Sequence, residues 1–375
     1  MTHRDRVMLA LNHKQPDREP MDLGSFTFSS INKKVYDDLK NIIGIKEETL
    51  LTNRFIQSAY VNFEVLKYLE TDFRPIYFSP RENSIDIESS SSTYIDNWGV
   101  ERFMPEHGYY YDQKDYPLAG DISADTLKKY PWPDPDDPAM YRGMRERAEK
   151  IKEENEYAIT FNPGIIFVHW SQFLRGYEDW NMDILADQEL FGYLCDCVLE
   201  YSLEICSRGL DEVGDLIDVI GMSDDFATQT GMLISPDLYR KMIKPRHKRY
   251  FDMIRSKTNA KLLFHSCGAI ESIIGDLIDI GVDIINPVQV SANNMDPTKL
   301  KRNYGKDICF WGGIDTQNIL PYGSPVEVKK EVRRIIDILG EDGGYVLNSV
   351  HTIQPDVPVQ NVIAMYEEGR KLIRV

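Results

Sequence analysis

One complete strand–helix–strand unit lies within residues 261–286, which read KLLFHSCGAIESIIGDLIDIGVDIIN. Its two apolar runs, Leu262–His265 and Asp283–Asn286, have the length of buried strands, and Ile270–Ile280 between them has helical spacing. Gly281 separates the helix from the second strand. Two strands joined through a helix in this way lie parallel, with a right-handed connection. The unit therefore predicts an α/β fold with a parallel sheet.

The same alternation of short apolar runs and amphipathic helices extends across residues 151–375. The other strands expected there are Ala158–Phe161, Leu216–Ile220, Ile308–Trp311 and Tyr345–Asn348, and the other helices are Asp187–Arg208, Pro236–Thr258, Pro325–Leu339 and Val357–Lys371. With one or two strands from the first part of the chain, such as Met21–Gly24, these units predict a closed (β/α)8 TIM-like barrel. An open doubly wound sheet is the alternative, but no Gly-rich dinucleotide or phosphate loop favours it.

Residues 1–150 have a different character. Asp5–Leu11 has helical spacing, but most of this part is irregular, and the prolines between Pro131 and Pro138 predict a long surface connection. We therefore expect one barrel domain over residues 1–375. In it, residues 1–150 form an N-terminal helical and irregular extension and cap, and residues 151–375 form the regular β/α units.

Composition restricts the class of protein and its partners. The 375 residues include 43 Lys and Arg against 60 Asp and Glu, a formal net charge of −17 that disfavours nucleic acid as a ligand. No apolar run is long enough to cross a membrane, and the N-terminus lacks the apolar segment of a signal peptide. Five scattered cysteines indicate a reducing cytoplasm rather than a disulfide framework. The expected partners are small molecules or another protein.

Polar side chains follow the predicted strands, at the end of a parallel barrel where active sites lie. His265 and Cys267 end one strand, and residues i and i+2 of an extended segment point to the same side, so both can bind one metal ion. Zinc is bound by such nitrogen and sulfur ligands, and a catalytic site uses three of them. His351 follows the last strand and is the expected third ligand, ahead of His169 and Cys309. The alternative is a buried thiol beside a hydrogen-bonded strand histidine.

Further candidates lie at neighbouring strand ends. Asp224 and Asp225 can serve as general acid, general base or hydrogen-bond partner, or else as a helix N-cap or ion-pair residue. Arg175 can bind an anionic substrate group or form a structural salt bridge. The polar groups expected to contact substrate in the pocket are Asn286, Gln289 and Gln229.

Segments along the whole chain match the pattern of one superfamily. They are Arg4–His13, Pro16–Pro20, Phe173–Glu178, Ser223–Gln229, Ile234–Tyr239, Lys244–Arg246, Phe264–Gly268, Asn286–Gln289, Met295–Pro297 and Trp311–Asp315. On these segments the chain resembles the uroporphyrinogen decarboxylase superfamily, and the resemblance implies a TIM-like barrel. The His-x-Cys pair resembles the corrinoid-dependent methyltransferase branch, in which zinc is bound by that His, that Cys and a later Cys. His351 stands at the matching late position here.

This departure from the branch affects the expected chemistry. Two thiolates and one imidazole would neutralise Zn²⁺, whereas one thiolate and two imidazoles leave a stronger Lewis acid. Cleavage of an aryl methyl ether needs such an acid, because its phenolate leaving group has a conjugate-acid pKa of about 10.

The resemblance therefore implies a zinc-dependent methyltransferase of the O-demethylase type. It would move a methyl group from a small methylated substrate, with a methoxylated aromatic compound as the expected class, to a Co(I) corrinoid. No Asp-x-His-x-x-Gly corrinoid signature occurs, so the corrinoid is expected on a separate protein. The alternatives are a methylcorrinoid:thiol methyltransferase, a metal-independent tetrapyrrole decarboxylase, and a corrinoid-binding scaffold without catalysis.

Overall fold

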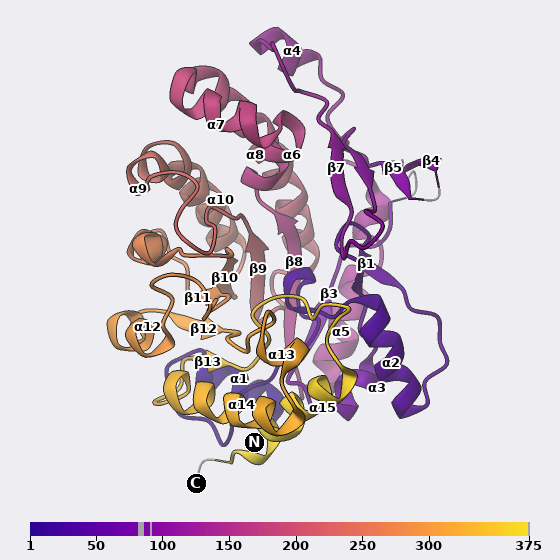
Figure 1. Ribbon diagram of the computed structural model, residues 1–375, viewed down its shortest axis with the longest axis vertical. Coiled ribbons are helices and arrows are strands. Elements are labelled where there is room, and N and C mark those ends of the chain that lie inside the picture. The colour runs from indigo at the N-terminus through magenta and orange to yellow at the C-terminus, as the bar shows by residue number, and fades with distance from the viewer. Residues whose placement is uncertain (82–85, 91, 374–375) are drawn as a thin grey trace.

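A sheet of seven parallel strands forms the centre of the computed structural model, which describes residues 1–81, 86–90 and 92–373 (Figure 1). The strand order is β13-β12-β11-β10-β9-β8-β3. The bounds are β3 Phe73–Ile76, β8 Ala158–Ile165, β9 Val219–Ser223, β10 Lys261–His265, β11 Ile284–Asn286, β12 Cys309–Trp311 and β13 Tyr345–Val346. All six strands expected after residue 151 are present, so the prediction of a parallel α/β fold is confirmed.

Residues 20–22 lie between the two edges of this sheet. The Asp22 N–H donates to the Leu347 carbonyl at 3.0 Å, next to β13, and the Asp72 N–H donates to the Met21 carbonyl at 2.9 Å, next to β3. The segment forms a parallel bridge with Leu347 and thereby closes the sheet into a barrel. The expected strand at Met21–Gly24 is thus a short bridge, and the open doubly wound sheet is excluded.

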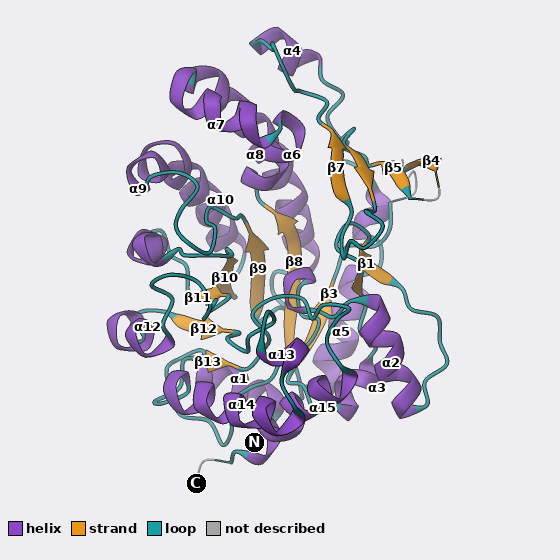
Figure 2. Cartoon of the chain, viewed as in Figure 1, coloured by secondary structure: helices purple, strands orange, loops and turns teal. Residues whose placement is uncertain are grey.

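Helices cover the outside of the barrel (Figure 2). Those that follow the strands or lie between them are α5 Met144–Glu154, α6 Val168–Arg175, α7 Tyr177–Ala186, α8 Gln188–Val213, α9 Pro236–Leu238, α10 Lys244–Lys257, α11 Ile274–Asp279, α12 Pro297–Tyr304, α13 Ile319–Tyr322, α14 Pro325–Leu339 and α15 Val359–Lys371. Short 3-10 turns at Thr27–Ser29, Pro138–Tyr141 and Glu271–Ile273 complete the helical elements. Within the described residues, no helix combines the length and hydropathy that crossing a bilayer requires.

The helix predicted over Pro236–Thr258 is interrupted. A π-helical turn, Tyr239–Ile243, separates α9 from α10. Pro245 has no N–H to donate to the carbonyl four residues earlier, so the regular α-helical ladder cannot continue through this point. Pro245 is visible in the sequence, so the interruption of the helix could have been predicted from it.

The first 150 residues are more regular than predicted. Beside α1 His3–Ala10, α2 Lys33–Ile43, α3 Phe63–Tyr68 and α4 Ala124–Lys129 they contain a two-stranded pair, β1 Leu51–Asn53 and β2 Ser58–Ala59. They also contain an antiparallel sheet of β4 Ile87–Ser90, β5 Thr93–Ile95, β6 Glu101–Phe103 and β7 Asp112–Asp115. The small antiparallel sheets were not predicted, because strands of two to four residues, most of them polar, carry no hydrophobic alternation that a sequence pattern could reveal.

The carboxylate of Asp72 ties the N-terminal segment to the barrel. It is fully buried and accepts hydrogen bonds from Arg6 at 2.7 Å, from Arg18 at 2.8 Å and from the Met21 N–H at 2.6 Å. Burial raises the pKa of Asp72, but the hydrogen bond from His3 and the charges of the two arginines outweigh it, so the pKa lies below its usual value. The segment that closes the barrel therefore depends on a buried ionic cluster.

Replacing Asp72 by Asn should lower the free energy of unfolding by about 3–5 kcal/mol, because the buried Arg18 loses its counter-charge and Arg6 keeps only its pair with Asp17. Because the pKa of Asp72 is lowered in the folded protein, the wild type should lose stability as the pH falls below about 4. The D72N variant has no carboxyl group at this position and should not show this contribution to the pH dependence. Urea unfolding at several pH values measures both effects. The control is Asp215→Asn, which breaks an exposed pair with Arg145 and should leave the midpoint nearly unchanged.

Candidate metal centre at the carboxyl ends of the barrel strands

The end of β10 presents His265 and Cys267 to the mouth of the barrel. Parallel pairing places His265 level with Ser223 of β9 and Asn286 of β11. The Cys267 Sγ lies 3.4 Å from the His265 Nε2, so the predicted same-side orientation of residues i and i+2 is present. His351, in the loop after β13, completes the group: the ligand atoms of the three residues all lie within 4.8 Å of one another.

This donor set fits zinc. Ligands at about 2.0–2.3 Å from one tetrahedral ion lie about 3–4 Å from each other, and the 3.4 Å between Cys267 Sγ and His265 Nε2 falls in this range. Burial lowers the pKa of His265 and lowers that of His351 to about 4, so both imidazoles are neutral at pH 7 and have lone pairs to offer. Burial raises the pKa of the Cys267 thiol, so binding a metal would release its proton.

Asn286 fixes the orientation of His265. The Nδ1 of His265 lies 2.5 Å from the Asn286 Oδ1, and the Asn286 Nδ2 donates to the Trp311 carbonyl at 3.0 Å. Because the amide oxygen can only accept, His265 carries its proton on Nδ1 and keeps Nε2 free. Phe28 stacks on the same imidazole, with ring centroids 4.3 Å apart. Asn286 is fully buried behind His265, which corrects the expectation that it contacts substrate in the pocket.

The two adjacent aspartates point in different directions. Asp224 is fully buried, accepts from the backbone N–H groups of Phe167, Val168 and His169 at the start of α6, and contacts His247 Nε2 at 3.1 Å. This is the helix-capping alternative of the sequence analysis, so the expectation of a catalytic role for Asp224 is corrected. Asp225 lines the cavity described below.

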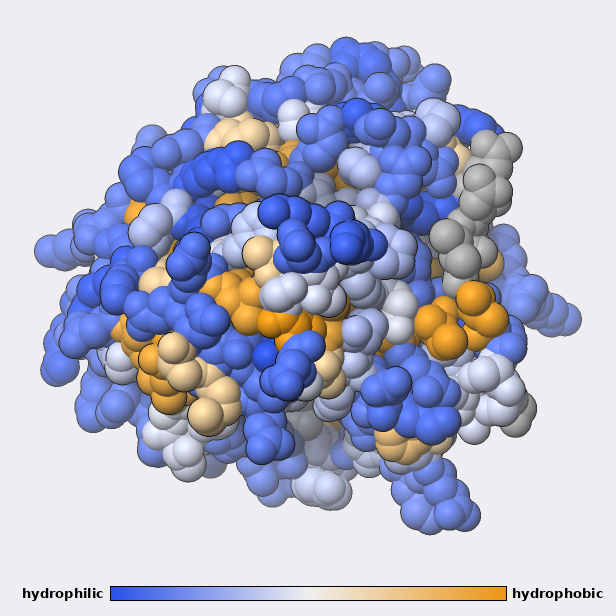
Figure 3. All heavy atoms as spheres, turned by 90° about the horizontal axis from the view of Figure 1, so that it is seen from above, coloured by the Kyte–Doolittle hydropathy of each residue, from blue (hydrophilic) through white to orange (hydrophobic). Residues whose placement is uncertain are grey.

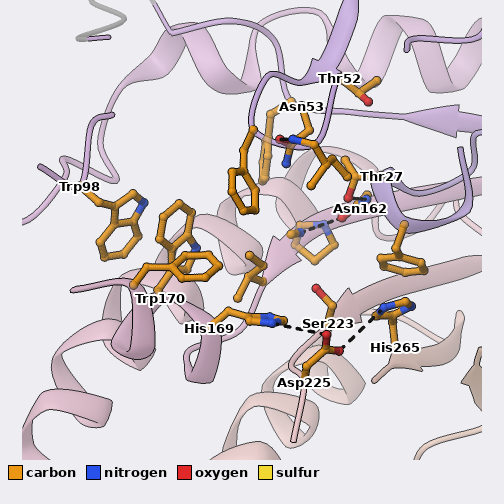
Figure 4. A pocket seen from close by; sticks show the side chains of 18 of the residues that line it. Thr27, Thr52, Asn53, Trp98, Asn162, His169, Trp170, Ser223, Asp225 and His265 are labelled. Carbon is orange, nitrogen blue, oxygen red and sulfur yellow. Dashed lines mark hydrogen bonds and ion pairs between the residues drawn. The ribbon is translucent and has the colours of Figure 1, made fainter. Parts of the chain in front are cut away.

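Asp225 lies between the metal-ligand group and His169. Its Oδ1 accepts from the Cys267 N–H at 2.8 Å and lies 3.9 Å from the His265 Nε2, and its Oδ2 lies 3.5 Å from the His169 Nε2. Burial raises the pKa of Asp225, but the neighbouring His169, His265 and Cys267 N–H outweigh it, so the carboxyl group is ionised. Figure 4 shows the chain of contacts from His169 through Asp225 to His265.

His169 is the contact that the sequence analysis underrated. From the sequence, His169 was considered only as an alternative metal ligand. In the structure it lies in α6 beside Asp225. Its position soon after the strand Ala158–Phe161 was the available signal.

The remaining candidates are not among the residues of the metal-ligand group. Gln289 accepts from the Gly268 N–H at 2.7 Å and lines a neighbouring cavity. Gln229 is exposed and donates to Gln317 at 2.7 Å. Arg175 is buried in ion pairs with Asp183 and Asp179, so the salt-bridge alternative describes it and its expected role in binding substrate is corrected.

Two cavities meet at the metal-ligand group. The first has a volume of about 680 Å³ and is reached by His265, His351 and Asp225; its aromatic wall includes Phe28, Trp98, Trp170, Phe173 and Tyr177 (Figure 4). The second, of about 470 Å³, is lined largely by polar groups such as Gln289, Asp315 and Gln354, together with Cys267 and His351. Seen from above, the surface of the molecule is mostly hydrophilic with separate hydrophobic patches (Figure 3). His351 lines both cavities.

Comparison with known proteins agrees with the barrel and the strand-end site. The sequence model of the family described as uroporphyrinogen decarboxylase (URO-D) matches residues 134–372, more than half of the chain. The chain belongs to the uroporphyrinogen decarboxylase family. The match includes the strands β8 to β13 and all three residues of the metal-ligand group.

Two individual proteins of known description are similar to this URO-D family member. The methylcobamide:CoM methyltransferase MtaA of Methanosarcina barkeri is 26% identical over 148 residues, which is 40% of this chain and 40% of that protein. A methyltransferase from Methanosarcina mazei superimposes with a TM-score of 0.64 at 17% identity and covers 99% of each chain. The second likeness confirms the fold, and the first spans about two fifths of the relative's length.

The metal-ligand group predicts about one zinc ion per chain after purification with zinc present. Cys267→Ser should lose most of this zinc, because the hydroxyl is a far weaker ligand than a thiolate. Metal analysis after dialysis measures the content. Cys197→Ser is the matched control, since Cys197 is half-buried in α8, away from the group, and should change nothing. Full zinc content in the Cys267→Ser variant would contradict the assignment.

Asn286→Ala should weaken zinc binding by about 10–100-fold without removing a ligand, because His265 loses the partner that fixes its tautomer and ring orientation. Competition with a chromophoric chelator measures the affinity. An unchanged zinc affinity would show that the hydrogen bond has no part in metal binding.

Proposed function

We propose that this protein is a zinc-dependent methyltransferase that moves a methyl group from a small methylated substrate to a Co(I) corrinoid on a partner protein. The observation that carries the proposal is the His265, Cys267 and His351 group, which reaches an aromatic-lined cavity at the carboxyl ends of the strands. The match to a protein described as a methylcobamide:CoM methyltransferase supports the same class of reaction.

The ligand set favours ether cleavage over thiol methylation. One thiolate and two neutral imidazoles would leave bound Zn²⁺ with a formal positive charge. When bound, zinc would supply Lewis acidity at the heteroatom that carries the methyl group. Asn286 would keep the His265 Nε2 turned toward the metal, and the buried Phe28 would hold the same imidazole from its other side.

The first cavity supports a methoxylated aromatic substrate. Its volume of about 680 Å³ lies within the range typical of small-molecule sites, about 300–1,000 Å³. Trp98 and Trp170 stack with centroids 4.6 Å apart, and Phe173 packs edge-on against Trp170 at 5.7 Å. These flat faces would hold an aromatic ring while its methoxy oxygen points to the metal-ligand group.

Methyl transfer from the substrate oxygen to Co(I) needs no additional oxidant or reductant. The electron pair of Co(I) forms the bond to the methyl carbon, and the pair of the carbon–oxygen bond stays on the oxygen. Cobalt must come within about 3–3.5 Å of that carbon, in line with the breaking bond. The partner protein would present the corrinoid at the carboxyl ends of the strands, because the cavities lie at that end of the barrel.

The thiol methyltransferase stays the second candidate, because the curated relative acts on CoM by its description. A tetrapyrrole decarboxylase fits less well. Its substrate carries many carboxylates, whereas Arg81 is the one Lys or Arg among the described residues that line the first cavity. The metal-ligand group would also have no use in a metal-independent reaction.

A methyl-transfer assay tests the proposal. Methoxyaromatic compounds incubated with the zinc-loaded protein and a reduced corrinoid protein should convert Co(I) to methyl-Co(III), followed by absorbance. Cys267→Ser should lose at least about 100-fold in rate, in line with the loss of an essential electrostatic group, and Cys197→Ser should not. Methylation of a thiol with no demethylation of any methoxy compound would contradict the ether chemistry.

A further inference from the structure

The geometry points to Asp225 as the fourth metal ligand of the substrate-free protein, exchanged for substrate by movement of its carboxylate to His169. This inference rests on the proposed function, because it takes His265, Cys267 and His351 to bind zinc. It adds Asp225 as the fourth ligand before substrate binds. It also adds His169 as the hydrogen-bond partner of the Asp225 carboxylate after substrate displaces it.

The first argument is distance. The Asp225 Oδ1 lies 3.9 Å from the His265 Nε2, against 3.4 Å from that same nitrogen to the Cys267 Sγ. Two ligands of one tetrahedral zinc ion lie about 3–4 Å apart, so the carboxylate is already within the range of a fourth donor. A carboxylate oxygen is one of the ligands that zinc takes in proteins.

The second argument is the side from which Asp225 approaches. Asp225 lines the first cavity, whereas Cys267 lines the second. A substrate heteroatom entering from the first cavity therefore meets the position that Asp225 can fill. Asp225 is held there by the Cys267 N–H, which donates to its Oδ1 at 2.8 Å.

The third argument is the partner on the far side of the carboxylate. The His169 Nε2 lies 3.5 Å from the Asp225 Oδ2, slightly beyond a good hydrogen bond. A small rotation of the carboxylate away from the metal-ligand group would shorten this contact. His169 is itself fixed by stacking on Phe173, with centroids 5.5 Å apart, so it offers a preformed place for the displaced carboxylate.

The two residues should therefore have opposite effects on metal affinity. Asp225→Asn keeps the shape and the acceptor for the Cys267 N–H but loses the anionic ligand, so zinc affinity should fall at least tenfold. His169→Gln removes the competing partner, so zinc affinity should stay equal or rise while the affinity for phenol, a demethylated product analogue, falls. A purely structural role of the pair would lower zinc affinity in both variants.

Cobalt substitution gives a readout that does not depend on catalysis. Without phenol, the visible Co²⁺ bands of Asp225→Asn should differ from those of the wild type, because one ligand differs. With saturating phenol the two spectra should converge, because the phenol oxygen would then occupy the fourth position in both proteins. Asp112→Asn is the matched control: it removes a carboxylate from β7 in the same cavity and should leave the Co²⁺ spectrum and zinc affinity unchanged.

The measurements test the fourth-ligand assignment and its displacement by phenol separately. Equal zinc affinity and equal phenol-free Co²⁺ spectra in the wild type and Asp225→Asn would overturn the fourth-ligand assignment, and a wild-type spectrum that phenol leaves unchanged would overturn the displacement. If Asp225→Asn fails to fold by circular dichroism, Asp225→Ala serves instead, and an unaltered Co²⁺ spectrum in it would overturn the inference, because alanine has no ligand atom. If Cys267→Ser retains its zinc, the proposed function fails first; if it loses zinc while Asp225→Asn matches the wild type, only this inference fails.

Discussion

The hydrogen bonds that join residues 20–22 to both edges of the sheet are the constraint on which the rest of the molecule depends. A parallel sheet of seven strands has two free edges, and this short segment satisfies the backbone groups of both near Leu347 and Asp72. Closure curves the sheet so that the loop after β13 reaches across to the end of β10. His351 can meet His265 only because the barrel is closed, so the metal-ligand group depends on contacts made by the N-terminal segment.

Neighbouring residues at one strand end serve different purposes in this site. Asp224 points into the protein and neutralises the positive start of α6, while Asp225, the next residue, points into the cavity. The same division applies to β10 and β11, where His265 reaches the ligand group and Asn286 supports it from behind. His265 therefore has a buried neighbour that fixes its position, which is the arrangement that a preorganised site requires.

The strands and the common side of His265 and Cys267 were predictable from the sequence for a physical reason. Buried parallel strands are continuous apolar runs, and His265 and Cys267 end one of them at a spacing that fixes their common side. The antiparallel sheet β4–β7 was not predictable, because its strands are short and mostly polar. The capping role of Asp224 and the supporting role of Asn286 depend on α6 and Trp311, which are distant in sequence, so residue type alone left both roles open.

His351 forms part of the wall of both cavities, the first of which has an aromatic wall beside its polar groups. A molecule that enters either side therefore changes the surroundings of the same imidazole. If the first occupant favours one position of that ring, the second occupant binds more or less tightly, and the effect is equal in both directions by thermodynamic linkage. If both cavities bind ligands, His351 is the member of the metal-ligand group through which a compound held in one would alter the other.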